Sequence, residues 1–163
     1  MRTLFFLLLA LGVGFVWWSS GVLPSTVAAH FAVDGAADGF MPRGQYVAFM
    51  IGLVIAVPTL VFWTARLASR LPLRFINLPN KQYWLAPERR AATLASLGAF
   101  GVWVACGLLG VLCVAHWLVV RANLEHPPRL EQAPLIAIVA AFLLALFVGI
   151  AVVLRRFLRV RVP

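Results

Sequence analysis

The chain has 163 residues, of which 63% are hydrophobic and 12% charged, and its formal net charge is +9. This apolar fraction exceeds the roughly 45–50% of ordinary soluble domains. The charged residues fall in clusters separated by long uncharged runs, which excludes a single soluble domain and predicts a membrane protein.

Four runs lack Asp, Glu, Lys and Arg, at residues 3–23, 46–65, 91–120 and 134–154. Each run is long enough to cross a hydrocarbon core of about 30 Å as a helix. Lipid offers no hydrogen-bond partners to the backbone, so spanning segments are expected to be helical. We therefore predict an all-α fold in which residues 1–163 form one membrane domain, a four-transmembrane-helix antiparallel bundle. The first run also has features of a signal peptide, but it continues through Trp17 and Trp18, and we expect a retained helix.

The positive charge is distributed unevenly between the two predicted sides of the membrane. Eleven of the fourteen Lys and Arg residues lie near the N-terminus, in the loop 66–90 and in the tail 155–163. The loops 24–45 and 121–133 hold the other three. The positive-inside rule predicts that both termini and the loop 66–90 are cytoplasmic. We expect the basic loop and tail to contact anionic lipid head groups, and a nucleic-acid partner is not needed to explain the charge.

The outer loop 24–45 contains His30, Asp34 and Asp38 at intervals of four residues. On one helix, these side chains would share a face and offer nitrogen and oxygen ligands to a divalent cation. Each aspartate is followed by glycine, however, which is a turn signal. Two interpretations stay open: a turn-rich loop whose aspartates bond to nearby backbone, and a metal or ligand site.

The basic loop 66–90 is the second segment with distinctive polar residues. It is interpreted either as a membrane-surface anchor or as a structured loop that binds a partner or a lipid head group. Pro87 and Glu88 predict the start of the third helix. The candidate lipid- or partner-binding residues of this loop are Asn77, Pro79, Asn80, Lys81, Tyr83, Trp84, Pro87, Glu88, Arg89 and Arg90.

The third helix carries a second constellation of Cys106, Cys113 and His116. Within one straight helix the two cysteines are too far apart to form a disulfide. We favour packing roles for them, and we expect the polar tip of His116 to reach water near the outer interface. In the loop 121–133, Glu125 and His126 add a carboxylate and an imidazole on the side predicted for His30.

Motifs of known catalytic sites are absent from the sequence. It has no phosphate-binding glycine loop, G-x-S-x-G elbow, H-E-x-x-H motif or C-x-x-C motif. An enzymatic role is therefore not favoured.

The outer-loop sequence LPSTVAAHFAVDGAADGF resembles that of a widespread bacterial membrane family of unknown function, whose domain also forms the N-terminal part of the SdpI-like immunity proteins. The segment INLPNKQYWLAPERR resembles a second hallmark of short four-helix members, and the likeness extends to RANL at residues 121–124. SdpI-like proteins protect against a secreted peptide toxin and hold a transcriptional repressor at the membrane. The resemblance thus implies a protein of the bacterial inner membrane. The residues that match the outer-loop pattern are Pro24, His30, Gly35, Asp38, Gly39 and Phe40.

These observations favour a non-enzymatic accessory, sensory or immunity-like protein that recognises a ligand or peptide through its outer loop. A membrane or cytoplasmic protein partner is expected, and no cofactor is. The first alternative is a metalloenzyme or metal-binding protein that uses His30 and Asp38 to hold a divalent metal. The second is a small transporter or channel, which the lack of Asp, Glu, Lys and Arg inside the four runs disfavours.

Overall fold

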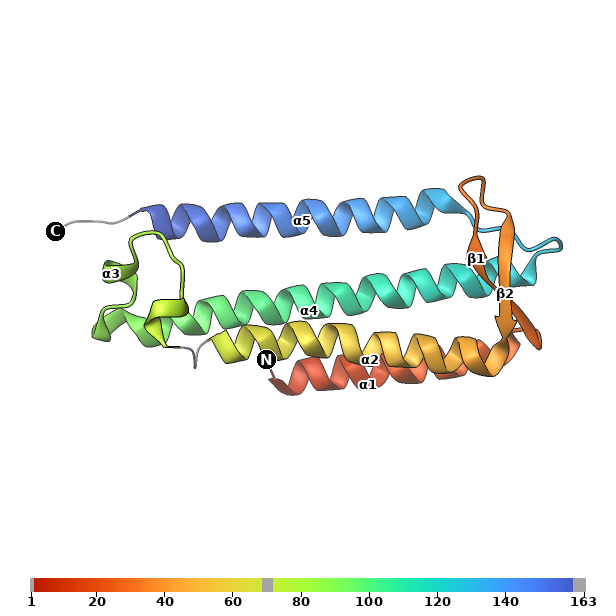
Figure 1. Cartoon of the computed structure of the whole chain (residues 1–163), viewed down its shortest axis with the longest axis horizontal. Coiled ribbons are helices and arrows are strands. Elements are labelled where there is room, and N and C mark those ends of the chain that lie inside the picture. The colour runs from red at the N-terminus through yellow and green to blue at the C-terminus, as the bar shows by residue number, and fades with distance from the viewer. Residues whose placement is uncertain (1, 69–71, 160–163) are drawn as a thin grey trace.

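Four long helices lie side by side in the computed structural model, which describes residues 2–68 and 72–159 (Figure 1). They are α1 (Arg2–Ser19), α2 (Arg43–Ala68), α4 (Pro87–Leu124) and α5 (Gln132–Leu158). All four are long and apolar enough to cross a membrane, α1 together with the 3-10 turn η1 (Ser20–Val22) that follows it. The prediction of four such helices is confirmed, and successive helices run in opposite directions.

The segment expected as an irregular outer loop contains a β-hairpin, so the all-α prediction is incomplete. Strand β1 (Thr26–Phe31) pairs antiparallel with β2 (Ala37–Pro42), with register irregularities between Ala28 and Phe31. An isolated two-stranded hairpin is marginally stable. This hairpin lies across the ends of the helices (Figure 1). Its contacts with them stabilise the hairpin, which its strand propensity alone would not do.

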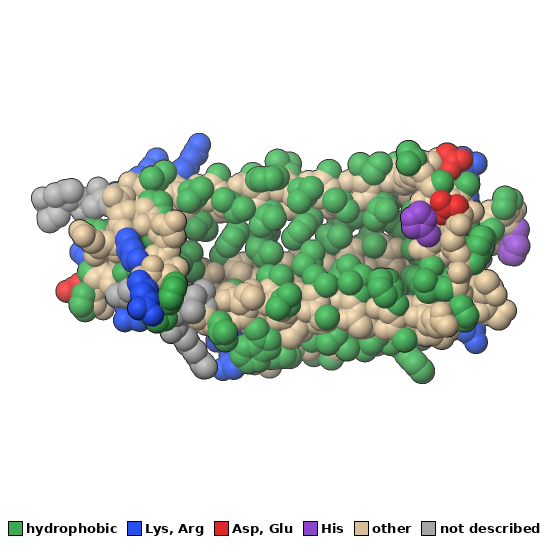
Figure 2. All heavy atoms as spheres, viewed as in Figure 1, with side chains coloured by type: hydrophobic (Ala, Val, Ile, Leu, Met, Phe, Trp, Pro, Cys, Tyr) green, Lys and Arg blue, Asp and Glu red, His purple; other side chains and the backbone are tan. Residues whose placement is uncertain are grey.

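The two ends of the bundle differ in charge (Figure 2). The end that carries β1 and β2, here called the hairpin end, holds four of the five acidic residues. The opposite end, here called the basic end, holds most of the Lys and Arg residues together with η2 (Leu73–Phe75) and α3 (Lys81–Trp84). The acidic residues of the hairpin end are Asp34, Asp38, Glu125 and Glu131.

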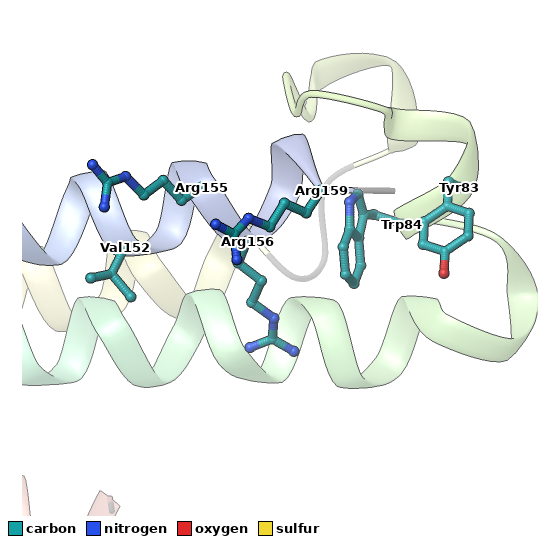
Figure 3. A pocket seen from close by; sticks show the side chains of 6 residues that line it. All are labelled: Tyr83, Trp84, Val152, Arg155, Arg156 and Arg159. Atoms are coloured by element: carbon teal, nitrogen blue, oxygen red, sulfur yellow. The ribbon is translucent and has the colours of Figure 1, made fainter. Parts of the chain in front are cut away.

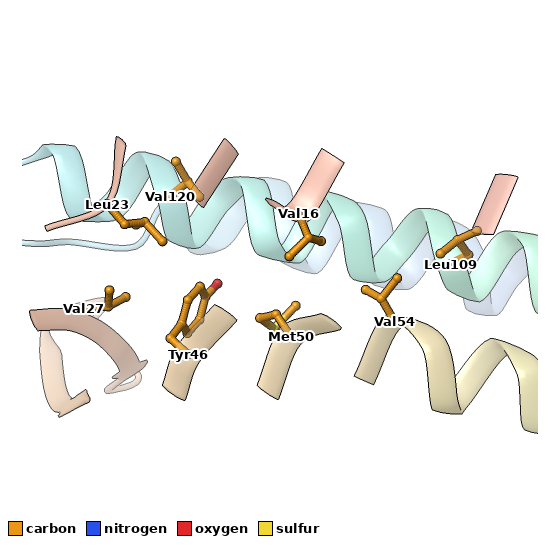
Figure 4. Close-up of a cluster of buried hydrophobic side chains, with 8 residues drawn as sticks. All are labelled: Val16, Leu23, Val27, Tyr46, Met50, Val54, Leu109 and Val120. Carbon is orange, nitrogen blue, oxygen red and sulfur yellow. The ribbon is translucent and has the colours of Figure 1, made fainter. Parts of the chain in front are cut away.

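The core joins α1, α2 and α4 in two clusters. The larger one lies toward the hairpin end and takes in the hairpin as well (Figure 4). The smaller one contains Phe5 and Phe62, whose rings stack with centroids 4.3 Å apart. Such a pair is worth about 0.5–1.5 kcal/mol beyond the apolar area that it buries. The larger cluster consists of Val16, Leu23, Val27, Tyr46, Met50, Val54, Leu109 and Val120.

Helix α5 is less embedded than the others and packs mainly on α4. A Cβ atom at Gly107 would stand 2.7 Å from the Phe142 ring, and one at Gly149 would stand 2.7 Å from the Phe100 ring. Both glycines therefore let a phenyl ring of the facing helix approach closely. Elsewhere the molecule is hollowed between α5 and the other helices (Figure 2), and most of the surface of α5 is exposed.

Candidate functional site

The turn of the hairpin is built around Asp34 and Gly35. The Asp34 carboxylate accepts a hydrogen bond from the Ala36 N–H (3.0 Å), which is an Asx-type contact. Gly35 has a φ of 85°, a left-handed conformation that favours glycine, and a Cβ there would stand 2.5 Å from the Leu130 carbonyl oxygen. The side chain of Asp34 thus shapes the turn by accepting a hydrogen bond from the backbone of Ala36.

His30 and Asp38 are brought together on the exposed side of the hairpin. The Nδ1–H of His30 donates to Asp38 Oδ1 at 2.5 Å, and the two side chains are 76% and 47% exposed. His30 lies opposite Gly39, and a Cβ at Gly39 would stand 2.8 Å from the His30 Cβ. The Asp-Gly pair at 38–39 therefore serves this site: the aspartate holds the imidazole, and the glycine leaves room for it.

Asn123, near the C-terminus of α4, holds strand β1 against the bundle. Its Oδ1 accepts from the Ala28 N–H (2.7 Å), and its Nδ2 donates to the Ala28 carbonyl (2.9 Å). Nδ2 also donates to the carbonyl of Val119 (2.9 Å). The side chain thus bonds to β1 as a neighbouring strand would, and it satisfies backbone groups of a residue that is fully buried.

The turn of the hairpin is fastened to the segment that leads into α5. The Leu130 N–H donates to the Gly35 carbonyl (2.9 Å), and an Arg129 guanidinium N–H donates to the Asp34 carbonyl (3.1 Å). Gln132, the first residue of α5, donates to the Ala32 carbonyl (2.9 Å). The hairpin is therefore held to the bundle along strand β1 and at its turn.

Glu125 and His126 are exposed in the loop between α4 and α5. Within residues 2–68 and 72–159, no three His, Cys, Asp or Glu side chains form a group that could hold a metal ion. In that part of the chain, Glu125 and His126 therefore form no metal-holding group with His30 and Asp38.

His116 takes part in a buried polar chain that sequence reasoning missed. Its side chain is fully buried, against the prediction that its tip reaches water. Nε2 lies 2.9 Å from Ser19 Oγ, and Nδ1 lies 2.9 Å from the Tyr46 hydroxyl oxygen. Because the Ser19 hydroxyl donates to the carbonyl of Phe15 (2.6 Å), the consistent assignment is Tyr46 O–H to Nδ1 and Nε2–H to Ser19. One neutral imidazole thus links α1, α2 and α4.

The two cysteines do not join His116. Cys106 and Cys113 instead line an open apolar groove of about 510 Å³ between α1 and α4. The Cys113 sulfur packs close to Gly12 of α1. A cavity of about 160 Å³ does lie against His116 and Tyr46, beneath Ala29 and Met41 of the hairpin.

At the basic end, Asn80 and Trp84 cap the C-terminus of α5. Asn80 adopts a left-handed conformation (φ 52°), and its Nδ2 donates to the carbonyls of Phe157 (3.0 Å) and Leu158 (3.3 Å). The Trp84 indole N–H also donates to the Phe157 carbonyl (2.9 Å). The last carbonyls of a helix lack intrahelical hydrogen-bond donors, and the side chains of Asn80 and Trp84 provide such donors here.

The remaining candidate residues of the basic loop 66–90 lie at the start of α4, in a ring contact, or at partly or fully exposed positions. Pro87 begins α4 and Glu88 lies in its first turn, as predicted. The Arg89 guanidinium lies 4.1 Å from the centroid of the Tyr83 ring. The other candidates, Asn77, Pro79, Lys81 and Arg90, lie at partly or fully exposed positions.

Comparison with known proteins gives a partial match. The profile of a family described as Domain of unknown function (DUF1648) matches residues 5–56, which comprise most of α1, the hairpin and the first half of α2. No curated protein and no solved structure matches the chain. The matched segment contains His30, Asp34 and Asp38, but neither Asn123 nor the basic loop. The match over residues 5–56 and the four long apolar helices fit an integral membrane protein of unknown function.

Proposed function

We propose that this is a non-enzymatic recognition protein of the bacterial inner membrane, which binds a ligand or peptide through its outer hairpin. The observation that carries the proposal is that the hairpin is fastened to α4 and α5 but presents exposed side chains. Val33 at the turn is 93% exposed, and Phe40 on β2 is 58% exposed. Preorganised loops bind with a smaller loss of conformational entropy, which favours recognition over a purely structural role.

The charge distribution supports the proposed orientation. The basic end holds most of the Lys and Arg residues, so the positive-inside rule assigns it to the cytoplasm and assigns the hairpin to the outer side. An immunity-like or sensory role fits this arrangement, because a secreted peptide would meet the hairpin first. The resemblance to SdpI-like proteins supports the same role.

Site-specific photo-crosslinking in living cells tests the proposal. A photoreactive phenylalanine analogue replaces Phe40, and the matched control replaces Phe147, an exposed phenylalanine of α5. We expect a discrete polypeptide adduct at Phe40 that is absent at Phe147 and weaker when His30→Ala is added. Adducts of lipid alone at Phe40, or the same polypeptide at both positions, would contradict the proposal.

A second candidate function is metal binding at His30, with further ligands supplied from outside the described residues, which contain no three-ligand group. The Nδ1–H of His30 is held by Asp38, which leaves Nε2 as the nitrogen available to a metal. Metal-ligating histidines commonly donate their other N–H to a carboxylate in this way. Elemental analysis of the purified protein beside His30→Ala tests this candidate. Near-stoichiometric metal that is lost in the variant would support a metal site, and metal-free protein in both samples would rule out metal binding at His30.

A further inference from the structure

The end of α5 at the basic end contains a cavity that the proposed function does not use. It has a volume of about 540 Å³ and is lined by three arginines, two aromatic residues and one valine (Figure 3). Its volume falls within the range of about 300–1,000 Å³ that is typical of small-molecule sites. The lining residues are Tyr83, Trp84, Val152, Arg155, Arg156 and Arg159.

The three arginines are not engaged in capping their own helix. Basic side chains near a helix C-terminus commonly bond to its last carbonyls. Here Asn80 and Trp84 donate to those carbonyls instead, so the guanidinium groups remain available. Arg156 lies over the indole of Trp84 at 5.9 Å, and both side chains point toward α4 (Figure 3).

The cavity has positive charge without a counter-ion. Among the described residues, no carboxylate is within ion-pair distance of Arg155, Arg156 or Arg159. Like charges three and four residues apart on a helix repel each other. An anion bound between them would remove this repulsion, and guanidinium groups match the geometry of phosphate oxygens.

We infer that this cavity binds the phosphate group of an anionic phospholipid. The arginines follow directly on the apolar sequence of α5, where a helix that spans a membrane is expected to leave the hydrocarbon. Trp84 and Tyr83 are residue types that favour the membrane interface. Val152 offers an apolar wall below the arginines, toward the acyl chains. Basic pockets between transmembrane helices are known to hold lipid head groups. The inference is independent of what the hairpin binds.

Native mass spectrometry of the purified protein in mild detergent provides the test. The protein is titrated with phosphatidylglycerol and, separately, with phosphatidylcholine. The test variant is Arg155→Gln/Arg159→Gln, and the matched control is Arg2→Gln/Arg74→Gln. All four side chains are exposed, and both double variants remove two positive charges.

We expect the wild-type protein to bind phosphatidylglycerol more tightly than phosphatidylcholine. Each cation near an anionic head group raises the binding affinity about fivefold. The test variant lacks two such cations, so its affinity for phosphatidylglycerol should fall about 25-fold. The control should keep nearly all of it. Val152→Trp, which fills the cavity without changing the charge, should also weaken binding.

Three results would overturn the inference. Equal losses in the test variant and the control would show general charge attraction instead of a site. Full binding by Val152→Trp would show that the cavity is not used. Displacement of the lipid by inorganic phosphate at similar concentration would identify a free anion as the ligand.

Discussion

Replacing Asn123 by Ala tests how the hairpin is held. The substitution removes both hydrogen bonds to Ala28, whose backbone N–H and carbonyl would then be buried without partners. Each buried unpaired group costs about 1–3 kcal/mol, so a loss of about 3 kcal/mol in the free energy of unfolding is expected. That is a large share of the roughly 5–15 kcal/mol by which a protein is stable. In a chain of this size it lowers the melting temperature by about 6–12 °C.

The assay is thermal unfolding in mild detergent, followed by tryptophan fluorescence, together with hydrogen exchange of the hairpin. Asn77→Ala, at an exposed position, is the control and should leave stability within about 0.5 kcal/mol of the wild type. The Ala28 amide should exchange faster in Asn123→Ala than in the wild type. An unchanged melting temperature with unchanged exchange would refute the assignment of Asn123 as the residue that holds β1.

Substitutions at three further positions test other contacts. Tyr46→Phe leaves His116 Nδ1 buried without a hydrogen-bond donor and should destabilise the bundle by about 1–2 kcal/mol. The same unfolding assay measures this loss, and an unchanged unfolding midpoint would show that the hydrogen bond contributes nothing to stability. Gly39→Ala places a Cβ 2.8 Å from that of His30 and should displace the hairpin, seen as faster amide exchange there; wild-type exchange would contradict the close approach. Asn80→Ala should be about 1 kcal/mol less stable than Asn80→Gly, because alanine resists the left-handed backbone; equal stabilities would argue against that conformation.

The helices were predictable because lipid imposes a simple rule on sequence. Each uncharged run became a helix, and α2, α4 and α5 extend beyond their runs because charged residues can continue a helix outside the hydrocarbon. The hairpin was not predictable in the same way. Its strands are short and contain several alanines and a glycine, so contacts with α2 and α4 decide its structure where local propensity does not.

The candidate site was predicted only where the relevant contacts are local. The turn at Asp34 and Gly35 follows from near neighbours in the sequence. Asp38 and Gly39 were also interpreted as a turn signal, and that was wrong, because both lie inside strand β2. By contrast, Asn123 bonds to a strand 95 residues away, and the buried histidine bonds to two other helices. A polar residue inside an apolar run was the available signal for His116, since it needs a buried partner there.

Helix α5 is held at both of its ends by side chains of other segments. At its first residue, Gln132 donates a hydrogen bond to the hairpin turn, and at its C-terminus Asn80 and Trp84 donate to its last carbonyls. Between these two ends, α5 packs mainly on α4. Its 27 residues form a rod about 40 Å long. Because side chains of other segments hold both of its ends, α5 stays docked on α4 although most of its surface is exposed.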